Sequence, residues 1–159
     1  AIVGKNPGSA SPVGLGTLAP LRLCGDKMLP SVRNRFIAAY ERASKPIDRG
    51  AFVRVWNLFY LCDEKLAPAI RSHKMISSPL LCESESGALP PIVWFAWGGA
   101  HPWLDRMKAR FRSMSPAQAF FYDHNRQSVT RGIPQPIDFP KHPQGLVAEP
   151  IVQFLAASL

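Results

Sequence analysis

Amide and imidazole side chains stand at three points of the chain where they could carry chemistry. The first is Asn6, in the polar turn Gly4-Lys5-Asn6-Pro7-Gly8 that follows an apolar opening segment. Pro7 restricts the backbone of this turn, and Gly8 allows another molecule to approach it closely. A side-chain amide there can orient a water molecule or hold a carbonyl group without changing its charge. Asn-Pro and Pro-Gly are also common in ordinary turns, so a purely structural interpretation stands beside the functional one.

The second amide is Asn57, which lies inside the apolar segment 53–59, where composition and period predict burial. A buried Asn must find partners for its two donors and its oxygen, so it either bonds to the backbone or faces a ligand. A donor and an acceptor on one group are also what the reading of a nucleobase edge requires. Both interpretations of Asn57 remain open at this point.

His142 lies between Lys141 and Pro143, in a loop that is otherwise rich in proline. Pro140 and Pro143 restrict the backbone on both sides of it, which is a way to position a side chain without a helix. The alternative is a solvated loop histidine. No pair of histidines and carboxylates has the spacing of a metal site, so we expect no metal ion.

The composition is that of one folded domain over residues 1–159. Hydrophobic residues make up 47% and charged residues 19% of the chain, which excludes a disordered tail or a coiled coil. Nineteen Lys and Arg against eleven Asp and Glu give a net charge of +8, and the pI is about 9.9. Such a balance is typical of proteins that bind phosphate-rich partners, although many small domains carry it only for solubility.

The three cysteines, Cys24, Cys62 and Cys82, have no CxxC spacing, so we expect neither a disulfide framework nor a cofactor held by thiolates. A reducing cytoplasm fits this pattern best. No apolar run reaches the roughly 18 residues that span a bilayer, and the amino terminus of this sequence lacks the basic-then-apolar order of a signal peptide. The chain opens inside an apolar strand without an initiator Met, which predicts that an amino-terminal part is missing. We expect a cytoplasmic protein, without a membrane contact, that is a monomer.

Strand and helix patterns alternate along the chain. Apolar, β-branched and aromatic runs predict four strands, over residues 1–3, 52–59, 92–97 and 119–122. Helical periodicity predicts four helices, one beginning near Pro30 and the others over residues 65–73, 102–114 and 150–159. Polar loops are expected over residues 9–28, 77–91 and 123–144.

This order predicts an α/β fold, a three-layer sandwich with helices on both faces of a central, mostly parallel four-stranded sheet. In such folds ligands bind outside the carboxyl ends of the strands. The turns that carry Asn6 and Asn57, and the loop that leads to His142, fall at that edge.

Four short blocks, taken in order, resemble a bacterial and phage family known as domain of unknown function 1643. The blocks are Asn6-Pro7-Gly8-Ser9-Ala10, Asn57-Leu58-Phe59, Trp97-Gly98 and His142-Pro143. The same blocks resemble the uracil-DNA glycosylase superfamily, whose members have a G-x-N-P-G type turn after the first strand, an Asn ending a second strand and a late HP-containing loop. The turn of residues 4–8 is a full match to the first of these features.

The second resemblance implies a uracil-DNA glycosylase-like fold and hydrolysis of the N-glycosidic bond of a flipped, uracil-like or modified base in single- or double-stranded DNA. It implies that Asn6 positions the attacking water, that Asn57 reads the base and that His142 stabilises the departing base anion. Further expected substrate contacts are Gly4, Pro7, Gly8 and Trp97.

No aromatic residue occurs between Ala1 and Phe36, so base stacking would fall to Tyr60 or Trp97. For the nucleic-acid backbone we expect contacts from Lys141, Arg106 and Arg110, although a basic helix face is often simply solvated.

Two other functions remain open. One is a non-catalytic nucleic-acid or nucleotide-binding module on the same scaffold. Asn6→Ala should leave binding nearly intact and abolish turnover only if the protein is the hydrolase. The other is a small-molecule α/β enzyme, whose binding would depend little on salt, whereas phosphate contacts give a steep dependence.

Overall fold

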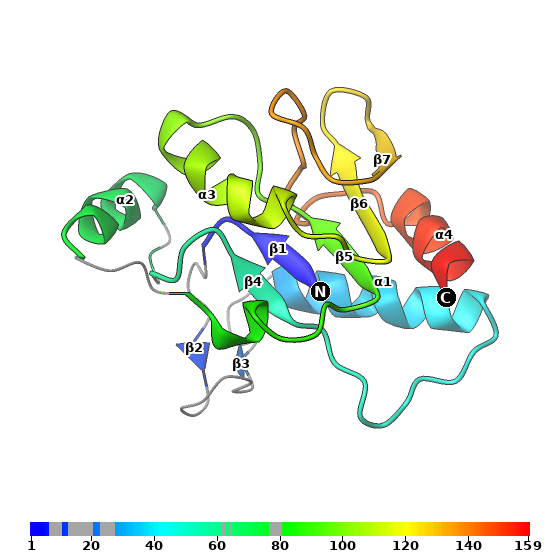
Figure 1. Cartoon of the computed structure of the whole chain (residues 1–159). Coiled ribbons are helices and arrows are strands. Elements are labelled where there is room, and N and C mark those ends of the chain that lie inside the picture. The colour runs from blue at the N-terminus through cyan, green and yellow to red at the C-terminus, as the bar shows by residue number, and fades with distance from the viewer. Residues whose placement is uncertain (7–10, 13–20, 23–27, 62, 64, 77–80) are drawn as a thin grey trace.

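The central sheet of the computed structural model has five strands in the order β4-β1-β5-β6-β7 (Figure 1). The structure describes residues 1–6, 11–12, 21–22, 28–61, 63, 65–76 and 81–159. The strands of this sheet are β1 (Ile2–Gly4), β4 (Val55–Asn57), β5 (Ile92–Phe95), β6 (Gln118–Asp123) and β7 (Ser128–Arg131). The first four strands in the spatial order are parallel, and β7 pairs antiparallel with β6.

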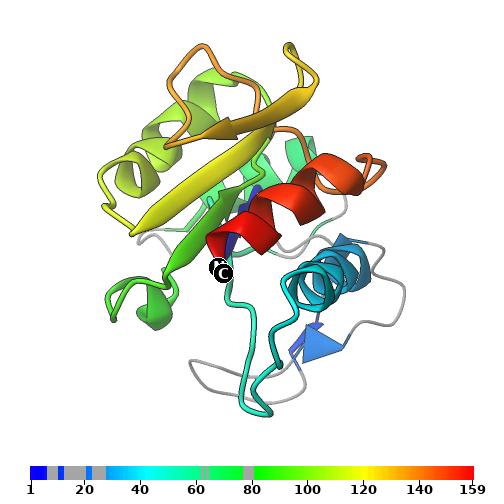
Figure 2. The same ribbon diagram turned by 90° about the vertical axis from the view of Figure 1, so that its right-hand side faces the viewer.

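Two pairs of helices cover the two faces of the sheet. The helices are α1 (Met28–Arg42), α2 (Leu66–Lys74), α3 (Pro102–Arg112) and α4 (Glu149–Ser158), and a 3₁₀ turn, η1, spans Glu83–Glu85. In Figure 2, α1 and α4 lie together on one side of the sheet and α3 lies on the other. Residues of α2 and α3 belong to one hydrophobic cluster, and residues of α1 and α4 belong to the other.

The side chains of β5 and its continuation show why both faces are covered. Ile92, Trp94 and Ala96 pack into the cluster with α1 and α4, whereas Val93, Phe95 and Trp97 pack into the cluster with α3. All six are buried, because a parallel strand in the middle of a three-layer fold is covered on both sides. Polar and apolar residues therefore do not alternate along this strand.

The α/β class, the layer order and the four expected helices are confirmed, with shifts of a few residues at the helix ends. The expectation of four strands is wrong, because Ser128–Arg131 forms a fifth, antiparallel edge strand inside a segment that we expected to be loop. The strand expected over residues 52–59 is shorter, since only Val55–Asn57 pairs with β1. Phe52 lies before this pairing and is 64% exposed.

The loop expected over residues 9–28 contains a short antiparallel ribbon, β2 (Ser11–Pro12) with β3 (Leu21–Arg22). No helix within the described ranges is both long and apolar enough to cross a membrane.

Candidate functional site

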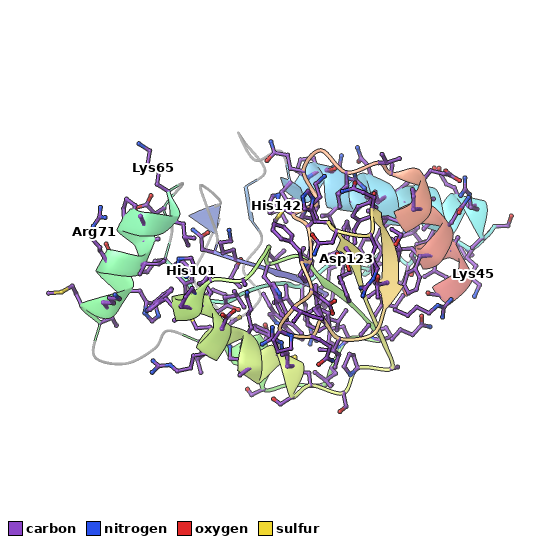
Figure 3. The ribbon with its side chains drawn as sticks, turned by 90° about the horizontal axis from the view of Figure 1, so that it is seen from above. Lys45, Lys65, Arg71, His101, Asp123 and His142 are labelled. Carbon is purple, nitrogen blue, oxygen red and sulfur yellow. The ribbon has the colours of Figure 1, made fainter. Side chains whose placement is uncertain are left out.

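The carboxyl ends of β1, β4, β5 and β6 lie at one edge of the sheet, because these strands are parallel and neighbours. Figure 3 looks onto the molecule from this side and labels His101, Asp123 and His142. The loops that leave these strands carry most of the residues singled out in the sequence. Pro7 and Gly8, which were expected to contact substrate, lie outside the described residues.

Asn6 follows β1, and its side chain is held by the segment after β4. Its Nδ2 donates to the carbonyl of Asp63 at 2.7 Å and to that of Leu61 at 3.4 Å. Because both partners are carbonyl oxygens, the amide nitrogen must face them, which turns Oδ1 away as an acceptor. Within the described part of the chain, no group donates to this Oδ1. A water molecule could occupy that position.

Asn57 is the last residue of β4 and is only 5% exposed. It pairs in register with Gly4 on β1, and a Cβ atom on Gly4 would lie 3.0 Å from the Asn57 Oδ1. No described residue forms a hydrogen bond with the Asn57 side-chain amide. Among the described residues the Asn57 amide is thus uncommitted, and its donor and acceptor can serve a ligand that reaches this edge of the sheet.

The backbone of Asn57 is held from both sides. Its N–H donates to the Tyr60 hydroxyl at 3.1 Å, and its carbonyl accepts from Arg110 Nη2 at 2.6 Å. Arg110 Nη1 also donates to the Leu58 carbonyl at 2.7 Å. These bonds position the end of β4 and therefore the direction of the Asn57 side chain.

Glu85 of η1 connects the two residues that hold Asn57. Its Oε2 accepts from Arg110 Nε at 3.0 Å, and its Oε1 accepts from the Tyr60 hydroxyl. Burial and the hydrogen bond to Glu85 raise the pKa of Tyr60 far above its ordinary value, so the phenol keeps its proton and remains a donor. The three side chains form one closed network around the strand end.

The loop that carries His142 is attached to the ends of β5 and β6 by main-chain bonds. The Gly98 N–H donates to the Pro140 carbonyl at 2.7 Å, and the Lys141 N–H donates to the Tyr122 carbonyl at 2.8 Å. The Phe139 ring lies so close to Gly99 that a Cβ atom there would be 2.4 Å from it. His142 is thereby brought to the same edge as Asn6 and Asn57.

The exposed His142 ring accepts a hydrogen bond at Nδ1 from the Gln144 N–H, at 3.3 Å. A neutral imidazole that accepts at Nδ1 carries its proton on Nε2. The tautomer that this contact favours is therefore one with an Nε2–H donor.

Trp97 does not lie where a substrate could contact it. The side chain is 1% exposed and packs against Phe95 and Phe111, with ring centroids 4.9 and 6.3 Å away. Tyr60, the other aromatic residue considered for base stacking, has its hydroxyl bound into the Glu85 network. The buried Trp97 ring has no face open to a ligand, so we do not retain Trp97 in the candidate site.

The basic residues expected at a nucleic-acid backbone are placed differently from one another. Arg106 is exposed on α3, and Lys141 is half-buried beside the end of β6. The guanidinium of Arg110 is committed to Glu85 and to the carbonyls of Asn57, Leu58 and Met107. Its role in this structure is to hold the end of β4.

Sequence reasoning missed Glu85 and Lys108. Glu85 lies in a segment expected to be a polar loop, where no local pattern distinguishes it. Lys108 had a signal, because it shares a helical stripe with Leu104 and Phe111, which are both buried. A cation on the apolar face of a helix is expected to be buried and bonded.

No group of three or more His, Cys, Asp or Glu residues that could hold a metal ion occurs in the described ranges. Comparisons of the chain with protein-family models, curated proteins and solved structures find no match. The site is therefore interpreted from its own geometry.

Proposed function

We propose that this protein binds a nucleobase of DNA at the carboxyl edge of its sheet and hydrolyses the bond between that base and its sugar. The observation that carries the proposal is Asn57, which is 5% exposed, is fixed through its backbone and has no hydrogen-bond partner for its side-chain amide among the described residues. A planar ligand with one donor and one acceptor side by side, such as the edge of a uracil-like base, is the complement of this group. A likeness of the fold to that of the uracil-DNA glycosylase superfamily is part of the same proposal.

Asn6 and His142 supply the chemistry in this proposal. The Asn6 Oδ1 accepts a hydrogen bond from a water molecule, whose oxygen attacks the sugar carbon as the carbon–nitrogen bond breaks. The base departs with the bonding electrons, the Nε2–H of His142 stabilises its negative charge, and the proton released by the water finally neutralises the base. A fixed donor at such a charge contributes a few kcal/mol to the transition state.

The charge of the chain agrees with a nucleic-acid substrate. The net charge of +8 favours association with a polyanion, and exposed Arg106 and half-buried Lys141 belong to the elements that border the site. A base must also leave the stack before its glycosidic bond can be reached, so binding requires a flipped or single-stranded base.

A non-catalytic module that binds nucleic acid or nucleotides is the second candidate. The observation that favours it is the burial of Trp97, which is 1% exposed and therefore cannot stack on a flipped base. In this alternative, Asn57 recognises a base but no bond is broken.

The two candidates are separated by incubating the protein with end-labelled single- and double-stranded DNA that carries uracil, mismatched or modified bases, followed by alkaline cleavage at abasic sites. Binding to the same strands is measured in parallel by fluorescence anisotropy. The variants are Asn6→Ala and His142→Ala, and Asn34→Ala, an exposed amide on α1, is the matched control. We expect the first two to lower turnover by roughly 10²–10³-fold with binding nearly unchanged.

Salt-sensitive binding together with no cleavage of any substrate would support the non-catalytic module instead. If neither binding nor cleavage is found for any DNA, the glycosylase and a module that binds DNA both fail.

A further inference from the structure

Two ammonium groups meet at the dipeptide Gly98-Gly99, where β5 ends. The Lys5 side chain lies over Gly98, since a Cβ atom at that position would be 3.5 Å from its Cε and from its Nζ. The Lys108 Nζ, from α3, donates to the Gly99 carbonyl at 2.8 Å. Figure 3 shows this end of α3 beneath the label of His101.

Among the described residues, the positive charges at this place are only partly balanced. Lys108 forms an ion pair with Asp105 at 2.9 Å, but the Lys108 side chain is 2% exposed whereas the Asp105 side chain is 43% exposed. No described residue accepts a hydrogen bond from Lys5. Two half-buried or buried cations therefore share one largely solvated carboxylate.

Both the burial of Lys5 and the nearby Lys108 disfavour a charge on its ammonium group. Burial, and then the nearby charge of Lys108, lower the pKa of Lys5 below its ordinary value. An ammonium also has three N–H donors, and the described residues accept only two of those of Lys108. Both groups would gain from an anion between them.

The backbone adds to the positive potential at the same point. α3 is an eleven-residue helix that begins at Pro102, and its N-cap His101 makes no capping hydrogen bond with its side chain. The amino end of such a helix carries a partial positive charge. The Nδ1 atom of His101 is buried and has no hydrogen-bond partner in the described part of the chain.

We propose that Lys5, Lys108 and the amino end of α3 form a binding site for a phosphate group. A phosphate suits the site because it offers several acceptor oxygens to donors that converge from different elements. We assign the phosphate to a phosphodiester of the nucleic-acid backbone. This assignment rests on the proposed function, whereas the phosphate site itself does not.

Lys5 immediately precedes Asn6 and follows Gly4, which contacts Asn57. A phosphate held by Lys5 would therefore lie at the same edge of the sheet as the two amides. It would hold the strand next to the base that they contact.

Two measurements test the site with the intact chain. The first follows the amide NMR signals of Gly98, Gly99 and Ala100 during titration with inorganic phosphate. The second measures the affinity for a short single-stranded oligonucleotide over a series of salt concentrations. The test variant is Lys5→Met, Lys5→Arg keeps the charge, and Lys45→Met removes an equal charge at an exposed position near the carboxyl end of α1.

We expect phosphate to shift the three signals in the unmodified chain, in Lys5→Arg and in Lys45→Met, and to lose this effect in Lys5→Met. We also expect Lys5→Met to lower the affinity for the oligonucleotide about ten-fold. It should reduce the slope of log affinity against log salt concentration by about 0.7 more than Lys45→Met does.

The outcomes separate this inference from the proposed function. A phosphate response without oligonucleotide binding would support the phosphate site while contradicting the nucleic-acid substrate. Oligonucleotide binding that Lys5→Met and Lys45→Met weaken equally, without a Lys5-dependent phosphate response, would overturn the site and leave the proposed function standing. If Lys5→Met and Lys45→Met give the same phosphate-induced shifts and the same oligonucleotide affinities, the inference is overturned.

Discussion

Gly4 and Asn57 lie opposite each other at the ends of β1 and β4, and the amide oxygen of Asn57 occupies the space that a side chain on Gly4 would need. A Cβ atom at Gly4 would be 3.0 Å from Oδ1, which is closer than carbon and oxygen normally approach. The strands stay paired just beyond this point, where the Leu58 N–H donates to the Gly4 carbonyl at 3.1 Å. The absence of a side chain on Gly4 thus allows the Asn57 side chain to point toward it.

The Gly4→Ala variant should therefore impair base recognition more than folding. The added methyl group turns the Asn57 amide, and we expect about ten-fold weaker binding of the preferred base-containing oligonucleotide with a loss of about 1 kcal/mol in stability. Anisotropy titration and urea denaturation measure the two quantities. Gly87→Ala is the control, because the nearest atom to a Cβ there, the Ser84 carbonyl oxygen, is 3.9 Å away. Equal binding by both variants would contradict a role of the Asn57 orientation.

Arg110 should contribute strongly to stability, because its guanidinium donates to three carbonyls and a carboxylate. The Glu85 side chain that it pairs with is 10% exposed, so Arg110→Ala would leave this charge without its partner. We expect a loss of about 2–4 kcal/mol in the free energy of unfolding, measured in urea. Arg106→Ala, which removes an exposed arginine from the same helix, should change it by no more than about 0.5 kcal/mol. Similar losses for both variants would show that the network contributes little.

Gly99 should tolerate no side chain, since the Phe139 ring fills its place. A Cβ atom at Gly99 would lie 2.4 Å from one ring carbon and 2.6 Å from the next, so Gly99→Ala must displace the ring and the loop that leads to His142. We expect a loss of roughly 1–3 kcal/mol in stability, and a loss of turnover if His142 is catalytic. The double variant Gly99→Ala with Phe139→Leu should recover part of the stability, because the smaller side chain vacates the space. An undiminished stability of Gly99→Ala alone would contradict this close contact.

The ion pair between Asp105 and Lys108 should make stability depend on pH in the acidic range. Burial alone would raise the pKa of Asp105, but the hydrogen bond and charge of Lys108 outweigh it and hold the pKa below its ordinary value. A carboxyl whose pKa is lower in the folded state stabilises that state above its ordinary pKa, and this contribution is lost as the pH falls through the lowered value.

Urea denaturation of the unmodified chain and of Asp105→Asn, at pH values from about 7 to about 3, tests this expectation. Because the Asp105 side chain is 43% exposed, solvent screening limits the difference at neutral pH to roughly 0.5–1 kcal/mol. The difference should be constant above about pH 5 and narrow below about pH 4. A difference that does not change with pH would mean that the charge of Asp105 contributes nothing to stability.

The sequence by itself determined the elements whose pattern is local. The unbroken apolar run of β5 and the helical stripes of α1 to α4 follow from residues that are near one another in the chain, so periodicity suffices to find them. Asn57 could be singled out for the same reason, because a polar residue inside a segment expected to be buried is visible without the fold.

Tertiary structure alone decided which of these residues meet, since contacts between distant segments have no signature in the pattern of either segment. The Asn6 amide bonds to a carbonyl 57 residues away, and Arg110 reaches a carbonyl 53 residues before it. Trp97 was expected at the site but is buried, because the strand direction turns it toward α3. Lys5 and Lys108 lie near each other only because β1 and β5 are neighbours in the sheet and α3 packs over them.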